Sequence, residues 1–247
     1  MTDFSIKIKK VGQSILSITF WIFVWFIISK IVNREVLVAS PFSVLKRIIA
    51  LVHADYFWIS AAMSLVRIIL GFLIAIISAV IVAVLAVKFK FVQTLIEPLM
   101  IIIKSTPVAS FIILAIVWLD LSFIPAFTSF LMVFPVMWTN VFTGIKATDK
   151  NLLEMVQIFN VKKSKVITKL YVPSVMPYFK SACIASIGLS WKAGIAAEVL
   201  CTPKNSIGKY LYESKIYLET ADLFAWTIVI IVLSLILEKI LIRVINK

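Results

Sequence analysis

The sequence has few residues that bind metals or form covalent crosslinks. Its 247 residues include one histidine, His53, and two cysteines, Cys183 and Cys201. A zinc site or an iron–sulfur cluster needs about four such ligands, so neither kind of centre is expected. The cysteines are 18 positions apart, which is about 27 Å along one helix and far beyond disulfide reach. We therefore expect two free, buried thiols.

Charged residues are also scarce, at 15% of the sequence, whereas 62% of the residues are hydrophobic and the mean hydropathy is +1.08. Soluble domains contain about 45–50% apolar residues, so a water-soluble globule is excluded. Lysine and arginine (25) outnumber aspartate and glutamate (12). Because these charges cluster between apolar runs, membrane topology explains them better than nucleic-acid binding, and we expect no nucleic-acid partner.

Six segments are apolar over the roughly 20 residues that a membrane-spanning helix needs. They are 14–32, 61–87, 92–119, 123–145, 174–200 and 223–243. Six spans place both termini on one side of the bilayer. Fourteen of the 25 lysines and arginines lie on that side and six on the other, so the positive-inside rule predicts cytoplasmic termini. The first span has no signal-peptide cleavage site and is expected to be an anchor.

The segments between the spans contain no long linker or repeat, so we expect one all-α membrane domain over 1–247 with a cytoplasmic N-terminus, 1–13. In the outer segment 33–60, Pro41 is placed where a short helix can begin. The outer segment 201–222 reads as a loop with one short helix. The fifth span carries small residues at every fourth position and is expected to be central in the bundle; these are Ala182, Ser186, Ser190 and Gly194.

The inner segment 147–172 is too long for a simple connector and is amphipathic. Leu152, Leu153, Val156 and Phe159 recur at roughly helical spacing, and Asn160 tolerates the left-handed conformation that ends a helix. Lysines follow, and a second amphipathic stretch, 166–172, stops at a proline. The pattern predicts a cytoplasmic helix-turn-helix. It fits a helix lying on anionic lipid or a docking surface for a soluble partner equally well.

The spacing of this segment resembles the EAA loop of the permeases of ABC importers. That loop has the pattern Glu-Ala-Ala, three residues, Gly, nine residues, Ile-x-Leu-Pro. This chain has Glu154-Met155-Val156, three residues, Asn160, nine residues and Leu170-Tyr171-Val172-Pro173. Two alanines and the glycine are replaced, so the helix end depends on the asparagine accepting the left-handed turn.

The resemblance extends over nearly the whole chain and is strongest to the subfamily that imports sulfonates, taurine, nitrate, bicarbonate and some thiamine precursors. The matching pieces, in order, are Ser40-Pro41, Ser64-Leu65-Val66-Arg67, Gly71-Phe72, Glu97-Pro98, Thr106-Pro107, Pro135, Gly144-Ile145, Pro173, Pro177, Ser190-Trp191 and Ala197-Glu198. Only the loop over 147–173 is specific by itself.

The resemblance implies the type I importer fold: six spans, with a coupling helix between the fourth and fifth. Two copies form the pathway in a prokaryotic plasma membrane, and an external binding protein delivers the substrate. The coupling helix of each copy docks on a cytoplasmic ATPase dimer through Glu154, Met155, Val156, Phe159, Asn160 and Pro173. The chain has no G-x-x-x-x-G-K-[ST] loop, so we expect no cofactor here, and ATP and Mg on the partner.

Ionisable residues inside spans are costly and suggest function. The candidates for the translocation pathway are Lys104, Ser190, Trp191, Lys192 and Glu198. Lys192, with Lys104, would attract an anionic substrate; a structural pair between Lys192 and Glu198 is the alternative, and both stay open. Arg67 and Lys180 lie near span ends and are expected to snorkel to the surface.

The leading alternative of another class is an ion-coupled secondary transporter, which needs a titratable centre in the bundle. Only Glu198 offers one, and Asp120 lies near the outer boundary. A membrane enzyme ranks third because paired carboxylates and a nucleophile with a His base are missing. We expect His53 at the surface and the tryptophans near span ends to anchor the interface: Trp58, Trp118, Trp138 and Trp226.

Overall fold

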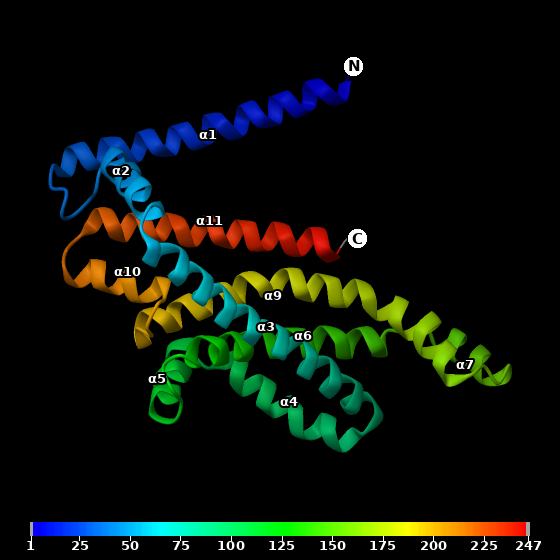
Figure 1. Cartoon of the computed structure of the whole chain (residues 1–247). Coiled ribbons are helices and arrows are strands. Elements are labelled where there is room, and N and C mark those ends of the chain that lie inside the picture. The colour runs from blue at the N-terminus through cyan, green and yellow to red at the C-terminus, as the bar shows by residue number, and fades with distance from the viewer. Residues whose placement is uncertain (1, 246–247) are drawn as a thin grey trace. The chain divides into compact units, whose positions relative to one another are not determined.

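Every regular element in residues 2–245 is a helix (Figure 1), which confirms the all-α expectation. The computed structural model describes the backbone of residues 2–245 and the side chains of residue 13 and residues 16–245. The elements are α1 (Thr2–Val32), α2 (Pro41–Val52), α3 (Asp55–Lys88), α4 (Lys90–Ser105), α5 (Val108–Trp118), α6 (Ile124–Lys146), α7 (Lys150–Ile158), α8 (Lys163–Val166), the π-helix η1 (Ile167–Tyr171), α9 (Val172–Cys201), α10 (Ile207–Ile216) and α11 (Thr220–Ile245).

The described residues form two compact units. The first unit comprises the residues up to Trp58 together with Tyr210–Ile230, and the second comprises Ile59–Lys209 together with the residues from Ile231. The second unit holds α4 to α9 and most of α3. It therefore contains the predicted coupling helix and all of the predicted pathway residues.

Three helices in the described chain are long and apolar enough to cross a membrane: Asp55–Lys88, Ile124–Lys146 and the continuous helical stretch Lys163–Cys201. They contain the predicted second, fourth and fifth spans. A bent pair, α4 and α5, would make a fourth. The predicted first span overlaps the apolar helix Leu16–Val32, and the predicted sixth lies within α11. The count of six spans stays a prediction.

The predicted third span, 92–119, is interrupted at its polar stretch, residues 104–107. The segment forms α4 and α5, which meet at a bend of 106°. Thr106 between them is extended, with ψ 132°, because the ring of Pro107 disfavours the helical conformation in the residue before it. The segment is therefore a broken span or a re-entrant pair.

The core of the second unit lies along α6 and α9, which make its most extensive helix pair. The small-residue stripe predicted on the fifth span is buried. The hydroxyl of Ser129 on α6 donates to the carbonyl of Ser190 on α9 at 3.1 Å. A Cβ on Gly194 would lie 2.5 Å from the side chain of Ile68 on α3. These contacts confirm that the fifth span is central within this unit.

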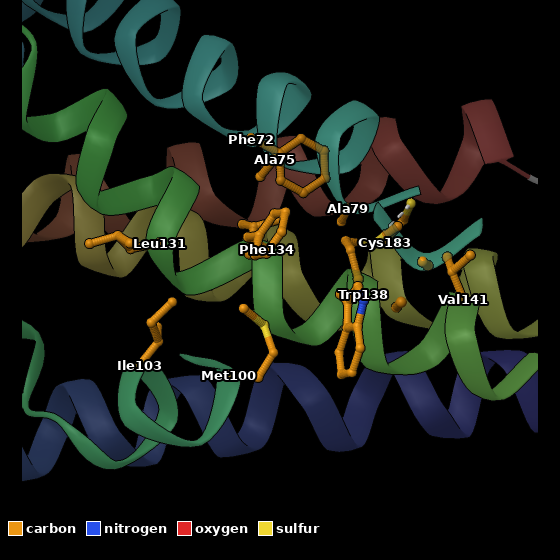
Figure 2. Packing of buried hydrophobic residues seen from close by; sticks show 14 of the residues in the cluster. Phe72, Ala75, Ala79, Met100, Ile103, Leu131, Phe134, Trp138, Val141 and Cys183 are labelled. Carbon is orange, nitrogen blue, oxygen red and sulfur yellow. Dashed lines mark hydrogen bonds between the residues drawn. The ribbon is translucent and has the colours of Figure 1, made fainter. Parts of the chain in front are cut away.

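Alanines bring α3 close to the same core, as Figure 2 shows for Ala75 and Ala79 beside Phe134 and Cys183. Ala75, Ala79 and Ala83 are all fully buried, whereas Ile77 on the same helix is 61% exposed. A small-residue face towards protein and a large apolar face outwards is the pattern of a helix in lipid.

Two of the four predicted interface tryptophans are buried instead. Trp138 and Trp226 are 5% and 1% exposed, whereas Trp58 and Trp118 are 61% and 76% exposed. Trp138 stacks on Phe142 within α6, and Trp226 stacks on Phe57 and Tyr210 within the first unit. Trp138 and Trp226 therefore pack against other aromatic rings in the interior and do not lie at a membrane interface.

The two short helices that the sequence predicts in segments 33–60 and 201–222 are present. α2 starts at Pro41, and the hydroxyl of the residue before it, Ser40, accepts from the backbone N–H of Ser43 at 3.2 Å. α10 is the one helix between α9 and α11. Cys183 and Cys201 are free and buried, as predicted.

Candidate functional site

The predicted coupling helix is α7, a nine-residue helix with no buried residue. Asp149 begins it by accepting a hydrogen bond from the backbone N–H of Asn151 at 2.8 Å, which satisfies a donor that a helix N-terminus leaves free. Phe159 at its end is 72% exposed and Met155 is 48% exposed. Glu154 is exposed beside them and Val156 is half-buried. α7 therefore presents apolar groups and one carboxylate that nothing in the described chain covers.

Asn160 ends α7 in the left-handed conformation, with φ 48°, as the sequence predicts. The N–H of Asn160 donates to the carbonyl of Gln157 at 3.2 Å, and the N–H of Val161 donates to the carbonyl of Val156 at 3.1 Å. This is the Schellman arrangement, which satisfies the last carbonyls of a helix. The asparagine thus does the task that the glycine has in the EAA pattern.

The second half of the helix-turn-helix does not stop at Pro173. Residues of α8, η1 and α9 form one continuous helical stretch, and Pro173 lies in the first turn of α9. A proline in this place removes one backbone donor, and the wider π-turn of η1 directly before it changes the hydrogen-bond register there. The predicted coupling loop thus runs without a break into the long helix that contains the predicted fifth span.

The predicted pathway residues divide into exposed and buried groups. Lys104 and Lys192 are exposed, on α4 and α9; the amine of Lys104 donates to the hydroxyl of Thr139 on α6 at 2.9 Å. Ser190, Trp191 and Glu198 are buried, with exposures of 0%, 1% and 0%. Of these five residues, only the two lysines are exposed on the described chain.

Glu198 is the centre of a buried polar group, the Glu198 cluster, formed with Ser64, Arg67 and Gly208. One carboxylate oxygen accepts from the Ser64 hydroxyl at 2.7 Å and from the Gly208 N–H at 3.1 Å. The other lies 3.8 Å from the Arg67 guanidinium. The Ser64 hydroxyl also accepts from the N–H of Ile207 at 3.0 Å. The cluster ties α3 and α9 to the start of α10.

One expectation about these charges, and one alternative that the sequence left open, are wrong. Arg67 does not snorkel: its side chain is 11% exposed, and it donates to the carbonyls of Lys204 and Asn205 at 3.0 and 3.3 Å. Glu198 does not pair with Lys192, because its carboxylate faces α3 and α10. The contacts of Ser64 and Gly208 with Glu198 were not predicted from the sequence. The three-residue spacing of Ser64 and Arg67, which puts both on one helix face, could have indicated that Ser64 shares a partner with Arg67.

A second ion pair lies in the first unit and carried no sequence signal, because its partners are 175 positions apart. The guanidinium of Arg47 on α2 donates two hydrogen bonds to the carboxylate of Asp222 on α11. Nη2 donates to Oδ2 at 2.7 Å, and Nε donates to Oδ1. Its hydrogen bond with Asp222 raises the pKa of Arg47 above its usual range. The pair joins the two segments that the sequence places on the outer side.

Asp120, the other carboxylate considered for ion coupling, is solvent-exposed between α5 and α6. It accepts from the N–H and the hydroxyl of Ser122 at 3.0 and 2.8 Å. These hydrogen bonds to the charged form lower the pKa of Asp120. An exposed carboxylate held in its charged form is poorly suited to carry protons through a bundle.

The family model of the binding-protein-dependent transport system inner membrane component matches residues 71–247. A probable ABC transporter permease protein of Brucella melitensis is 23% identical over 236 residues, covering 95% of each chain. The bicarbonate transport system permease protein of Synechococcus elongatus is 26% identical over 74% of this chain and 66% of its own. The formylaminopyrimidine transport permease protein of Halalkalibacterium halodurans is 23% identical over 68% of this chain and 67% of its own.

The family match covers more than half of the chain and includes the predicted coupling helix and α9. Proteins of this family work with a binding protein and an ATPase and are not themselves catalytic. The chain therefore belongs to the binding-protein-dependent transport system inner membrane components and is the multi-pass, inner-membrane permease subunit of an ABC transporter.

Proposed function

We propose that the chain is the permease of an importer in which two copies form the pathway, each with six spans and cytoplasmic termini. α7 docks in a groove of a cytoplasmic ATPase dimer, which holds ATP and Mg, and this chain binds no cofactor. Closure of the ATPases moves α7 and switches the pathway between inward-facing and outward-facing states. An external binding protein delivers substrate to the outer segments.

One observation carries the coupling proposal: α7 is a short, capped helix with several exposed apolar side chains. Phe159, Met155 and Leu152 are 72%, 48% and 41% exposed. An amphipathic helix with spaced apolar anchors is suited to a hydrophobic groove. Its two ends are fixed by Asp149 and Asn160, so it is preorganised for docking. The stretch after α7 is continuous through Pro173 into α9. Displacement of α7 would therefore be transmitted to the long helix that contains the predicted fifth span.

The substrate proposed is a small anionic or organic solute, such as a sulfonate, nitrate or a vitamin precursor. Two of the relatives are named for the transport of bicarbonate, an anion, and of formylaminopyrimidine, an organic ring compound. The exposed cations Lys104 and Lys192 favour the anionic choice. The burial of Ser190, Trp191 and Glu198 favours a role for them in the wall rather than in substrate contact.

Co-purification tests the coupling proposal. The tagged permease is expressed with its ATPase and binding protein, extracted and purified, and the ATPase retained per permease is measured. Phe159→Ala removes the most exposed aromatic group near α7 and is expected to lower retention at least tenfold, as truncation of an interface anchor does. Glu219→Arg, a charge reversal at an exposed outer site, serves as the control and should retain the ATPase. Equal retention by Phe159→Ala and wild type would contradict docking through α7.

A further inference from the structure

An apolar groove of about 600 Å³ lies in the second unit at the C-terminal end of α3. The end of α3, the end of α6, η1 and the start of α9 line it. Its walls are aliphatic and aromatic, and the amine of Lys88 and the hydroxyl of Tyr171 are the polar side-chain groups in the lining. The volume falls in the range of about 300–1,000 Å³ that small ligands occupy in proteins.

The groove is open along a helix that is suited to span a membrane. Val84, one of its wall residues, is 50% exposed and lies on α3, one of the helices long and apolar enough to span a bilayer. Another wall is η1, a π-helical turn, which is rare and occurs mostly at functional positions. An apolar hollow in this position is accessible to lipid tails.

Seven lysines lie in, or within five residues of, the segments that line the groove. They are Lys88, Lys90, Lys146, Lys162, Lys163, Lys165 and Lys169. In the part of the chain that the structure describes, none of these lysines lies within 4 Å of a carboxylate oxygen. Lys88 instead lies over the ring of Phe89, 5.1 Å from its centre. The positive charge at the mouth of the groove is therefore uncompensated.

We propose that this groove binds one anionic phospholipid, with an acyl chain between α3 and α9 and the phosphate at Lys88. Basic pockets between spans at the cytoplasmic side are suited to anionic headgroups, and the side named here follows from the proposed orientation. A zwitterionic lipid would fill the walls but leave the lysine charge unbalanced. A second copy of this chain has the same excess of positive charge, +13 in all, so it would neutralise the lysines less well than an anionic lipid.

Native mass spectrometry of the complete detergent-purified transporter tests the site, with phosphatidylglycerol or phosphatidylethanolamine of identical acyl chains added as probes. The wild type is expected to retain one phosphatidylglycerol per permease in preference to phosphatidylethanolamine. Lys88→Gln should weaken that retention about fivefold, the effect of one lysine near an anionic surface. Val84→Trp, which fills the groove, should abolish it. The matched controls are Lys215→Gln, an exposed lysine on α10, and Ile77→Trp, two turns earlier on α3.

Three results would overturn the proposal. Retention of phosphatidylglycerol by Val84→Trp at the wild-type level would place the lipid elsewhere. Equal binding of both probes, unchanged by Lys88→Gln, would remove the headgroup contact. Crosslinking of a Met176→Cys variant to a second permease in the complex would make the groove a subunit interface. The ATPase retained in each preparation is measured in parallel, so that failure of α7 docking is distinguished from failure of lipid binding.

Discussion

The buried carboxylate of Glu198 is stable only because several groups compensate for its lost hydration. Ser64, Gly208 and Arg67 surround it, and the guanidinium also binds two carbonyls in the chain after α9. Burying one unpaired charge costs far more than the pair gains. The cluster therefore fixes the junction of α3, α9 and α10, rather than offering a free site for a coupling ion.

Removing one partner from this cluster is expected to destabilise the second unit. Glu198→Ala leaves the Arg67 charge buried without its carboxylate and should cost about 3–5 kcal/mol. Glu198→Gln keeps an acceptor for Ser64 and Gly208 and should cost less. The midpoint of thermal unfolding of the purified permease measures both, with the exposed Glu238→Gln as the control. A Glu198→Ala variant with the wild-type midpoint would contradict the structural role of the cluster.

Substitution of Lys192 tests whether the pathway selects its substrate by negative charge, because this exposed cation is a predicted pathway residue. If it attracts an anionic substrate in the pathway, Lys192→Ala should raise the substrate concentration for half-maximal uptake about tenfold or more, the worth of one charged hydrogen bond. The exposed Lys239→Ala on α11 should leave it unchanged. Uptake by Lys192→Ala with unaltered concentration dependence would remove this residue from the pathway.

Small residues decide how closely the spanning helices approach. A Cβ on Gly71 would lie 2.1 Å from the carbonyl oxygen of Ala126 on α6. Non-bonded heavy atoms clash at this distance, so one of the two helices would have to move. Gly188 on α9 has no atom within 4 Å of the same position. The two glycines thus differ in function: one permits contact between helices, whereas the other faces open space.

This difference predicts opposite results for two identical substitutions. Gly71→Ala should separate α3 from α6 and lower stability by about 1–3 kcal/mol, as overpacking does. Gly188→Ala should raise stability by up to about 1 kcal/mol because alanine favours a helix more than glycine. Thermal unfolding of both variants in one detergent checks the pair. Equal loss of stability in the two variants would show that the α3–α6 contact is looser than described.

The turn after α7 makes a comparable prediction for the coupling helix. Asn160 has φ 48°, which glycine adopts without strain and a β-branched residue does not. Asn160→Gly is expected to retain the ATPase as the wild type does, whereas Asn160→Val should lose most of it while the spans stay folded. If both variants retain the ATPase equally, the orientation set by this turn is unimportant for docking.

At the scale of the whole molecule, local signals in the sequence predict the helices well. The positions of α2, α3, α6 and α7 and the left-handed Asn160 follow from periodicity, caps and turn residues. The bend between α4 and α5 was signalled by Thr106-Pro107, but its size depends on what the two halves pack against. Apolar length alone predicts one span over 92–119 and does not distinguish a broken span from a re-entrant pair of helices.

The partners of buried charges could not be predicted in this way. Glu198 bonds across helices to residues whose proximity depends on the left-handed Thr202 and Asn205 in the chain after α9. Arg47 and Asp222 meet only because the first unit brings distant segments together. Pairing of this kind is set by tertiary packing, which no local pattern encodes. Sequence similarity, in contrast, identifies the family through the order of many weak motifs.

A transport assay in liposomes tests directly whether α7 couples this permease to ATP hydrolysis. The complete complex is reconstituted, and ATP hydrolysis and substrate uptake are measured for the wild type and for Glu154→Arg, which reverses the exposed charge on α7. Coupling through α7 predicts ATP-dependent uptake by the wild type and loss of uptake in the variant with an unchanged thermal midpoint. Uptake driven by an ion gradient without any ATPase, and unaffected by Glu154→Arg, would contradict it.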